Sequence, residues 1–120
     1  MNLNKKLIDL LGVTGLPVEP YEYTGKSDKY IVFVYESERP VMFADNTITD
    51  DTARLQVQLI TPKNYNHFKL KKEIRTLLEG ADFLVTGIRE ILGTVYVGTE
   101  KIRQTVFEVT YTEHRKMEDN

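Results

Sequence analysis

A run of six residues, Tyr30–Tyr35, constrains the fold more than any other stretch of this sequence. Every position in the run is apolar or aromatic, so a strand formed there has two apolar faces. Such a strand lies in the middle of a sheet and is covered on both sides, by the protein's own core or by a partner. A second run, Thr52–Thr61, alternates apolar and polar residues and predicts a strand with one buried face.

Two short helices are predicted from the spacing of leucine and isoleucine. The first covers about residues 3–11, with Gly12 placed as its C-cap. The second follows a turn at Pro62–Asn66, where Asn64 or Asn66 supplies the N-cap, and it ends at Gly80. Each helix has one apolar stripe, so each must dock on another element.

Three more strands complete the predicted fold: Val18–Thr24, Phe83–Glu90 and Lys101–Thr112, with a turn region at Ile91–Gly98 before the last. Pro20 points to an edge position, because proline cannot donate to a sheet ladder. The sequence therefore predicts an α+β fold, with a mostly antiparallel sheet of about five strands and both helices packed on one face. The element order is α-β-β-loop-β-α-β-β, with residues 1–112 as a single domain and 113–120 as a charged C-terminal tail.

The segment from Glu36 to Asp51 breaks the strand pattern and is predicted to be a long loop. It carries five acidic residues against one basic residue, and Pro40 lies near its middle. Loops of more than about 12 residues are uncommon in compact domains and are usually functional or mobile. The apolar residues Val41, Met42 and Phe43 within it have two interpretations: a docking element that orders on a partner, or a strand packed back on its own sheet.

Composition and motifs argue against most kinds of chemistry. The chain has no cysteine, which excludes disulfides, thiolate metal sites and cysteine nucleophiles, and its net charge of −2 argues against bulk electrostatic binding of nucleic acid. No segment has the roughly 18 apolar residues that a membrane span requires. The sequence contains neither a glycine-rich phosphate loop nor a nucleophile elbow.

The candidate ligand residues are also isolated. His67 and His114 have no second ligand at metal spacing, and we expect each to be an exposed or capping residue. Asp45, Asp50 and Asp51 lack the glycine and the closing glutamate of a calcium loop. The basic residues of the second helix are expected to form a solvated face: Lys69, Lys71, Lys72 and Arg75. We therefore predict no catalytic, cofactor-binding or metal-binding residues, and a protein that is not an enzyme.

A series of short elements carries a resemblance to a known family. In order they are Tyr30–Tyr35, Glu38-Arg39-Pro40, Phe43-Ala44-Asp45, the alternating strand Leu55–Thr61, and the turn Pro62-Lys63-Asn64. This arrangement resembles the small tail-completion proteins of long-tailed bacteriophages, also called head–tail joining or tail-terminator proteins. The similarity extends loosely over nearly the whole chain.

The resemblance implies a structural subunit that closes into a ring, with six copies expected, which caps the tail tube and meets the head connector. It implies a virion protein that is assembled in the cytoplasm of a host bacterium. The expected partner interface is the segment between the two central strands, with the residues Glu38, Arg39, Val41, Met42, Phe43, Asp45, Asp50 and Asp51. Two alternatives remain: another phage neck or minor capsid protein, and a small nucleic-acid-processing or regulatory protein.

Overall fold

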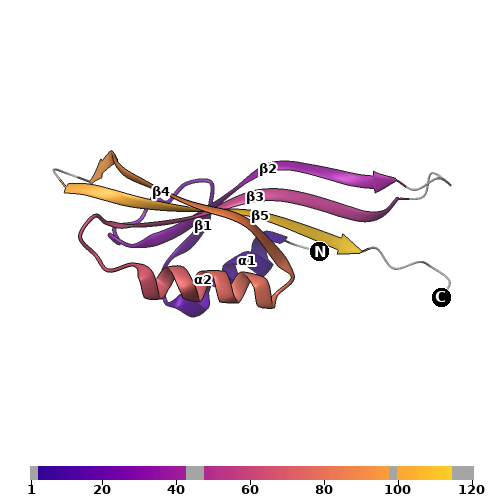
Figure 1. Ribbon diagram of the computed structural model, residues 1–120, viewed down its shortest axis with the longest axis horizontal. Helices are drawn as coiled ribbons and strands as arrows, with labels where there is room; N and C mark the ends of the chain where they lie inside the picture. The colour runs from indigo at the N-terminus through magenta and orange to yellow at the C-terminus, as the bar shows by residue number, and fades with distance from the viewer. Residues whose placement is uncertain (1–2, 43–47, 98–99, 115–120) are drawn as a thin grey trace.

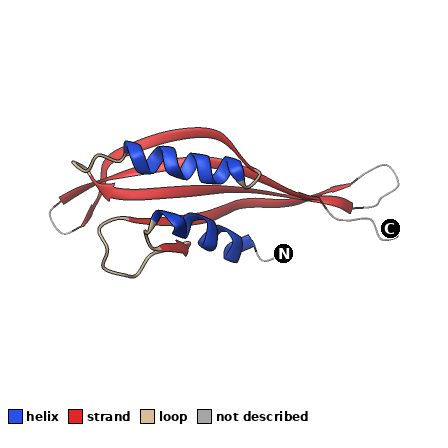
Figure 2. Cartoon of the chain, turned by 90° about the horizontal axis from the view of Figure 1, so that it is seen from below, coloured by secondary structure: helices blue, strands red, loops and turns tan. Residues whose placement is uncertain are grey.

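The computed structural model describes residues 3–42, 48–97 and 100–114, and the surroundings of side chains in 3–36, 52–92 and 101–112. The elements are α1 (Leu3–Leu11), the 3-10 helix η1 (Gly12–Thr14), β1 (Val18–Pro20), β2 (Tyr30–Met42), β3 (Ile48–Pro62), α2 (Phe68–Gly80), β4 (Phe83–Val97) and β5 (Glu100–His114). The strands form one sheet in the order β1-β2-β3-β5-β4, in which only β1 pairs in parallel. Both helices lie on the same face of the sheet (Figures 1 and 2). The predicted fold class is confirmed.

The main core lies between this face and the two helices. Alternate residues of β3 point into it, and Leu55, Val57 and Leu59 are fully buried. They pack with buried residues of the other elements: Leu7 and Leu11 of α1, Ile31 and Phe33 of β2, Ile74 and Leu78 of α2, Phe83 of β4, and Phe107 and Val109 of β5. Burial of each large apolar side chain contributes roughly 1.5–3 kcal/mol, so this layer is the main source of stability.

The second apolar face of β2 is covered by the chain itself. Val32 packs with Ile60 and Ile102 in a smaller cluster, and Tyr23 and Tyr30 lie against it. The rings of these two tyrosines stack with their centroids 4.4 Å apart. The segment between β1 and β2 therefore closes one end of the sheet face that the helices leave open, which explains why the Tyr30–Tyr35 run is apolar on both sides.

The edge position predicted from Pro20 is confirmed, although the strand is shorter than expected. β1 covers only Val18–Pro20, rather than reaching Thr24, and pairs with Ile31, Val32 and Phe33 of β2. The chain turns away at Tyr21, whose φ is 67°. The left-handed residue that ends the first helical segment is Gly15, with φ 84°, and not Gly12, because η1 extends the segment by one turn.

The prediction of a long loop from Glu36 to Asp51 is wrong. β2 continues to Met42 and β3 begins at Ile48, and residues 37–42 pair with residues 48–54, while residues 43–47 lie outside the described part of the chain. A register shift between Tyr35 and Ser37 occurs where the apolar run of β2 ends, and the strand continues beyond it. Pro40 is tolerated because β1 borders β2 only at residues 31–33, so β2 is an edge strand from there on.

The turn predicted at Ile91–Gly98 is corrected in the same sense, and β5 includes the first two residues of the segment 113–120 that was predicted as a tail. β4 continues to Val97, with a register shift between Leu92 and Tyr96, and β5 includes Glu113 and His114. Backbone pairing with a neighbouring strand extends each of these strands beyond the apolar pattern. Apart from the short edge strand β1, the sheet therefore consists of two long antiparallel pairs, β2–β3 and β4–β5, joined by the pairing of β3 with β5.

Replacement of Phe107 by alanine tests whether the layer under the helices dominates stability. Phe107 is fully buried, so Phe107→Ala should lower the free energy of unfolding by about 3–5 kcal/mol through lost burial and cavity formation. Leu84→Ala is the control, because Leu84 is 62 % exposed and should change stability by at most about 0.5 kcal/mol. Denaturant titration followed by circular dichroism measures both, and equal losses would contradict the core as described.

Candidate functional site

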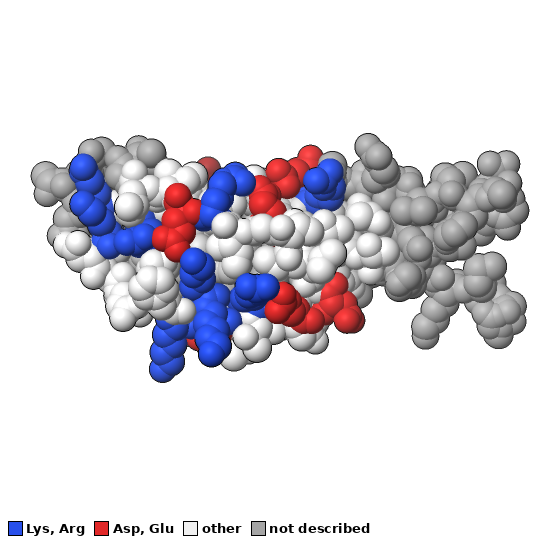
Figure 3. Space-filling model, in the orientation of Figure 1, with Lys and Arg blue, Asp and Glu red and all other residues white. Residues whose placement is uncertain are grey.

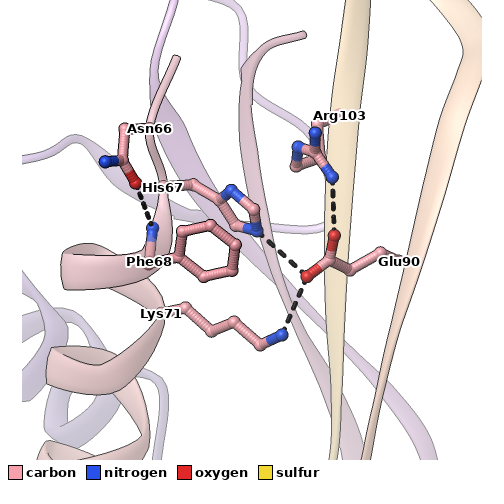
Figure 4. Close-up of polar contacts among 6 residues, drawn as sticks. All are labelled: Asn66, His67, Phe68, Lys71, Glu90 and Arg103. Atoms are coloured by element: carbon pink, nitrogen blue, oxygen red, sulfur yellow. Dashed lines mark hydrogen bonds and ion pairs between the residues drawn. The ribbon is translucent and has the colours of Figure 1, made fainter. Parts of the chain in front are cut away.

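One carboxylate, that of Glu90 on β4, is held by three cationic or donor side chains (Figure 4). Nε2 of His67 lies 3.0 Å from its Oε2, Lys71 Nζ donates to the same oxygen at 2.8 Å, and Arg103 Nη1 donates to Oε1 at 2.6 Å. These donors come from the residue before α2, from α2 itself and from β5. We call these four residues the Glu90 cluster.

The local sequence explains how these side chains meet. His67 and Lys71 are four residues apart at the start of α2, so both lie on one side of the helix and reach the same oxygen. Glu90 is paired in register with Thr105 on the sheet face that the helices cover. Thr61 and Thr105 are buried there as well, so polar residues replace the aliphatic core at this end of the sheet.

The cluster fixes the charge of Glu90. The hydrogen bond from Lys71, followed by that from His67, lowers the pKa of the Glu90 carboxyl from 4.5 to about 2, against a smaller opposing effect of burial. Its side chain is 25 % exposed, so water screens part of these interactions. A carboxylate that stays ionised at neutral pH is a poor general acid or base there. The arrangement is suited to fastening α2 to β4 and β5.

His67 differs from the expectation that it is exposed or capping. It is 2 % exposed, and although it holds the position before α2 its side chain does not cap the helix. The prediction of Asn64 or Asn66 as the N-cap residue is therefore wrong, although Asn66, one residue earlier, accepts the Phe68 N–H with its Oδ1 at 3.3 Å. The other expected histidine, His114, is the last residue of β5.

The opposite sheet face carries a second polar arrangement that crosses four strands. Gln104 donates to Gln58 at 2.9 Å, and Gln58 donates to Gln56 at 3.0 Å. Gln56 in turn donates to Glu36 and to Glu108, each at 3.3 Å, and Arg89 donates to Glu108 at 2.7 Å. The outward glutamines predicted for β3 are therefore joined to their neighbours.

The predicted interface residues occupy neighbouring positions on two paired strands. Glu38, Arg39, Val41 and Met42 lie on β2, and Asp50 and Asp51 on β3, while Phe43 and Asp45 lie outside the described residues. The register pairs Val41 with Asp50 and places Asp51 opposite Glu113 of β5. β4 begins at Phe83, opposite Tyr111, so it does not border the part of β5 beyond that residue. We call Ser37–Met42, Ile48–Thr52 and Thr112–His114 the acidic ribbon.

The other end of the molecule is basic. Figure 3 shows Lys and Arg side chains gathered around the end where α2 begins. Four of the exposed lysines that have no acidic partner in the described part of the chain lie on the turn, on α2 and on β5: Lys63, Lys69, Lys72 and Lys101. A backbone bond of 3.1 Å from Lys63 N to the carbonyl of Lys101 brings two of them together. We call these four lysines the basic end.

Two further kinds of feature are missing from the described residues. Within 3–42, 48–97 and 100–114, no group of three or more His, Asp or Glu side chains is arranged to hold a metal ion. In the same part of the chain, no helix has the length and apolar character needed to cross a bilayer.

The Glu90 cluster predicts a specific dependence of stability on pH. The carboxyl has a lower pKa in the folded state than its ordinary value of 4.5, so the unfolded state binds more protons between the two values. Its contribution is complete above pH 4.5 and is lost as the pH falls towards about 2. Glu90→Gln should therefore flatten the loss of stability over this window and cost about 1 kcal/mol at pH 7.

Urea midpoints measured at several pH values for both proteins check this expectation. Glu79→Gln is the matched control, because Glu79 accepts only an exposed bond from Arg75 on the same helix. An unchanged slope in Glu90→Gln, or an equal effect of Glu79→Gln, would show that the cluster does not couple folding to protonation.

Comparison with known proteins supports the fold. No family model matches this chain, and no curated protein matches it. Twelve chains of solved structures match. One of them, titled only with a sequence identifier, is 12 % identical, has a TM-score of 0.51, and is aligned over 96 % of this chain and 93 % of its own length. At this identity the likeness concerns the fold alone.

Proposed function

We propose that this protein is a structural subunit of a tailed phage or prophage, which completes the tail and joins it to the head connector as an oligomeric ring. The acidic ribbon is the observation that carries the proposal. It extends β2, β3 and β5 past the point where β4 begins, in a molecule with principal extents of 57 × 24 × 24 Å (Figure 1).

A projecting ribbon suits an assembly role for a physical reason. An antiparallel ribbon holds its own backbone bonds, so it keeps its form while it offers faces and an edge to a neighbour. From Val34 onward, β2 has no strand on its outer side among the described residues. The Glu38-Arg39-Pro40 element, on which part of the family resemblance depends, lies on this edge.

The Glu90 cluster fits the same role. Its carboxylate is fully occupied by donors and stays charged, which stabilises the joint between α2 and the sheet. The proposed mechanism is therefore surface complementarity and ring closure, with no bond chemistry. A ring forms when one surface patch of each copy meets a different patch on the next copy and the rotation closes.

The mass of the protein in solution, alone and with purified tail tubes, tests this function. We expect a discrete oligomer by light scattering, or a monomer that assembles on tubes and caps their ends. A protein that stays monomeric and ignores tubes would overturn the proposal. Binding to isolated connectors without binding to tubes would favour another neck or minor capsid protein.

A change on the ribbon separates assembly from folding. Val41→Asp places a charge where we propose buried contact, so it should abolish the oligomer and tube binding while the monomer remains folded. Val13→Asp is the matched control, since Val13 is 66 % exposed and lies outside the ribbon. Light scattering and circular dichroism measure both properties. Unfolding of Val41→Asp alone would show that Val41 belongs to the core of the monomer.

A further inference from the structure

Three buried polar side-chain atoms have no hydrogen-bond partner among the described residues, and all three lie in one small region of the sheet. They are the hydroxyl oxygens of Thr61 and Thr105 and the Nε of Arg103. Thr61 and Thr105 are each 1 % exposed, so bulk water does not reach their hydroxyls. Buried polar groups in proteins nearly always have a partner, so three such atoms together indicate a bound molecule that supplies one.

The sheet register places these three side chains next to one another. Thr61 of β3 is paired directly with Arg103 of β5, and Thr105 lies two residues further along β5. All three are on the face that the helices cover, because Thr105 is paired with the buried Leu59 and side chains alternate along each strand. The three polar groups therefore meet around one position between β3 and β5.

The spacing of the groups suits a single small molecule. The Cβ atoms of diagonal neighbours in a sheet lie about 7 Å apart, which is too far for the hydroxyls of Thr61 and Thr105 to bond each other readily. A molecule that bonds at about 2.8 Å on each side spans such a gap. Internal water molecules typically make about three hydrogen bonds to polar groups that otherwise have none. Thr61, Thr105 and Arg103 supply three such groups.

The chemistry of the three groups also fits water. The Nε of Arg103 is a donor only, whereas each threonine hydroxyl is both a donor and an acceptor. A water molecule is able to accept from Arg103 and to complete its bonds with the two hydroxyls. The Arg103 Nη1 is bonded to Glu90 at 2.6 Å, so the Nε of the same guanidinium is left for a different partner.

The surroundings disfavour an ion at this position. Glu90 is paired in register with Thr105, and its carboxylate stays ionised at neutral pH, so it repels an anion. The guanidinium of Arg103 is always charged and repels a cation. A neutral molecule with both donor and acceptor capacity meets neither objection.

The neighbouring histidine helps to separate this region from solvent. His67, the residue before α2, is 2 % exposed and lies 3.0 Å from the carboxylate of Glu90 (Figure 4). We propose that one internal water molecule is bound by Thr61, Thr105 and Arg103 between β3 and β5, beside the Glu90 cluster, as an integral part of the folded subunit. The site does not depend on the proposed ring, because all its ligands come from one chain.

Removal of single hydroxyls tests the site through the sign of the change in stability. Thr105→Val keeps the shape of the side chain and removes one partner of the water. The equilibrium constant for folding should fall by about tenfold, because the water and its remaining partners lose a bond. A rise in the constant would overturn the proposal, since it would show that a hydroxyl without a partner had been replaced by an apolar group. Urea titration measures the constant.

A double variant tests whether both threonines hold the same water. Thr61→Val combined with Thr105→Val should cost no more than either change alone, because the first change already releases the water. A loss equal to the sum of the two single losses would contradict a shared site. Thr110→Val is the matched control, because Thr110 lies on the opposite face of β5 and is partly exposed. It should change the constant by no more than about twofold.

Nuclear magnetic resonance detects the water directly. In wild type we expect Overhauser contacts between a long-lived water and protons of Thr61 and Thr105. The double variant should lose these contacts, and Thr110→Val should keep them. If a valine variant fails to fold, Thr61→Ser and Thr105→Ser, which keep the hydroxyls, should fold and retain the contacts. Absence of the contacts in wild type would overturn the proposal, whatever the stabilities of the variants.

Discussion

The rest of the structure depends on the pairing of β3 with a strand on each side. β3 bonds β2 along one edge and β5 along the other, and it joins the two long hairpins into one sheet. Its residues Leu55, Val57 and Leu59 form the centre of the layer on which both helices pack. Because side chains alternate between faces, a slip of one residue would expose these three and bury Gln56 and Gln58. The core and the outer glutamine network therefore specify the same register.

Polar contacts also hold the two helices on the sheet, at positions that the aliphatic core does not reach. α1 is tied to β5 through Lys6, whose Nζ donates to the Tyr111 hydroxyl at 3.0 Å and lies 4.6 Å from the centre of its ring. α2 is tied to β4 and β5 through Glu90. Each helix thus has an apolar stripe on the sheet and directional polar contacts with it, which together set its position along the strands.

The sequence predicted the fold where apolar periodicity reports burial. The alternation in β3 and the two-sided run in β2 identified the centre of the sheet, and the leucine spacing identified both helices. Prediction failed where strands continue beyond the regular apolar pattern of the sequence. Residues 36–51 include five acidic residues and a proline, so only the backbone ladder reveals that most of them are strand. For the same reason, the strands predicted for β4 and β5 are shorter than those in the structure.

The residues of the Glu90 cluster could not be predicted from the sequence either. The contacts of the Glu90 cluster join residues that are 13 to 23 positions apart in the sequence, through a helix, a strand and a sheet register. No local motif marks such a group, and His67 seemed isolated because its partner lies two elements later. The ribbon residues were singled out from their charge and their family resemblance, but their pairing across β2 and β3 became visible only with the register.

The ion pairs of the subunit differ in how far solvent reaches them. Lys71 and Arg103 lie 2.8 Å and 2.6 Å from the Glu90 carboxylate, and the three side chains are 21–30 % exposed. Arg75 and Glu79, on the surface of α2, are 56 % and 46 % exposed and lie 3.3 Å apart. Salt screens partly buried pairs less than exposed pairs, so the contacts that fasten α2 to β4 and β5 are less sensitive to ionic strength than the pair on the surface of α2.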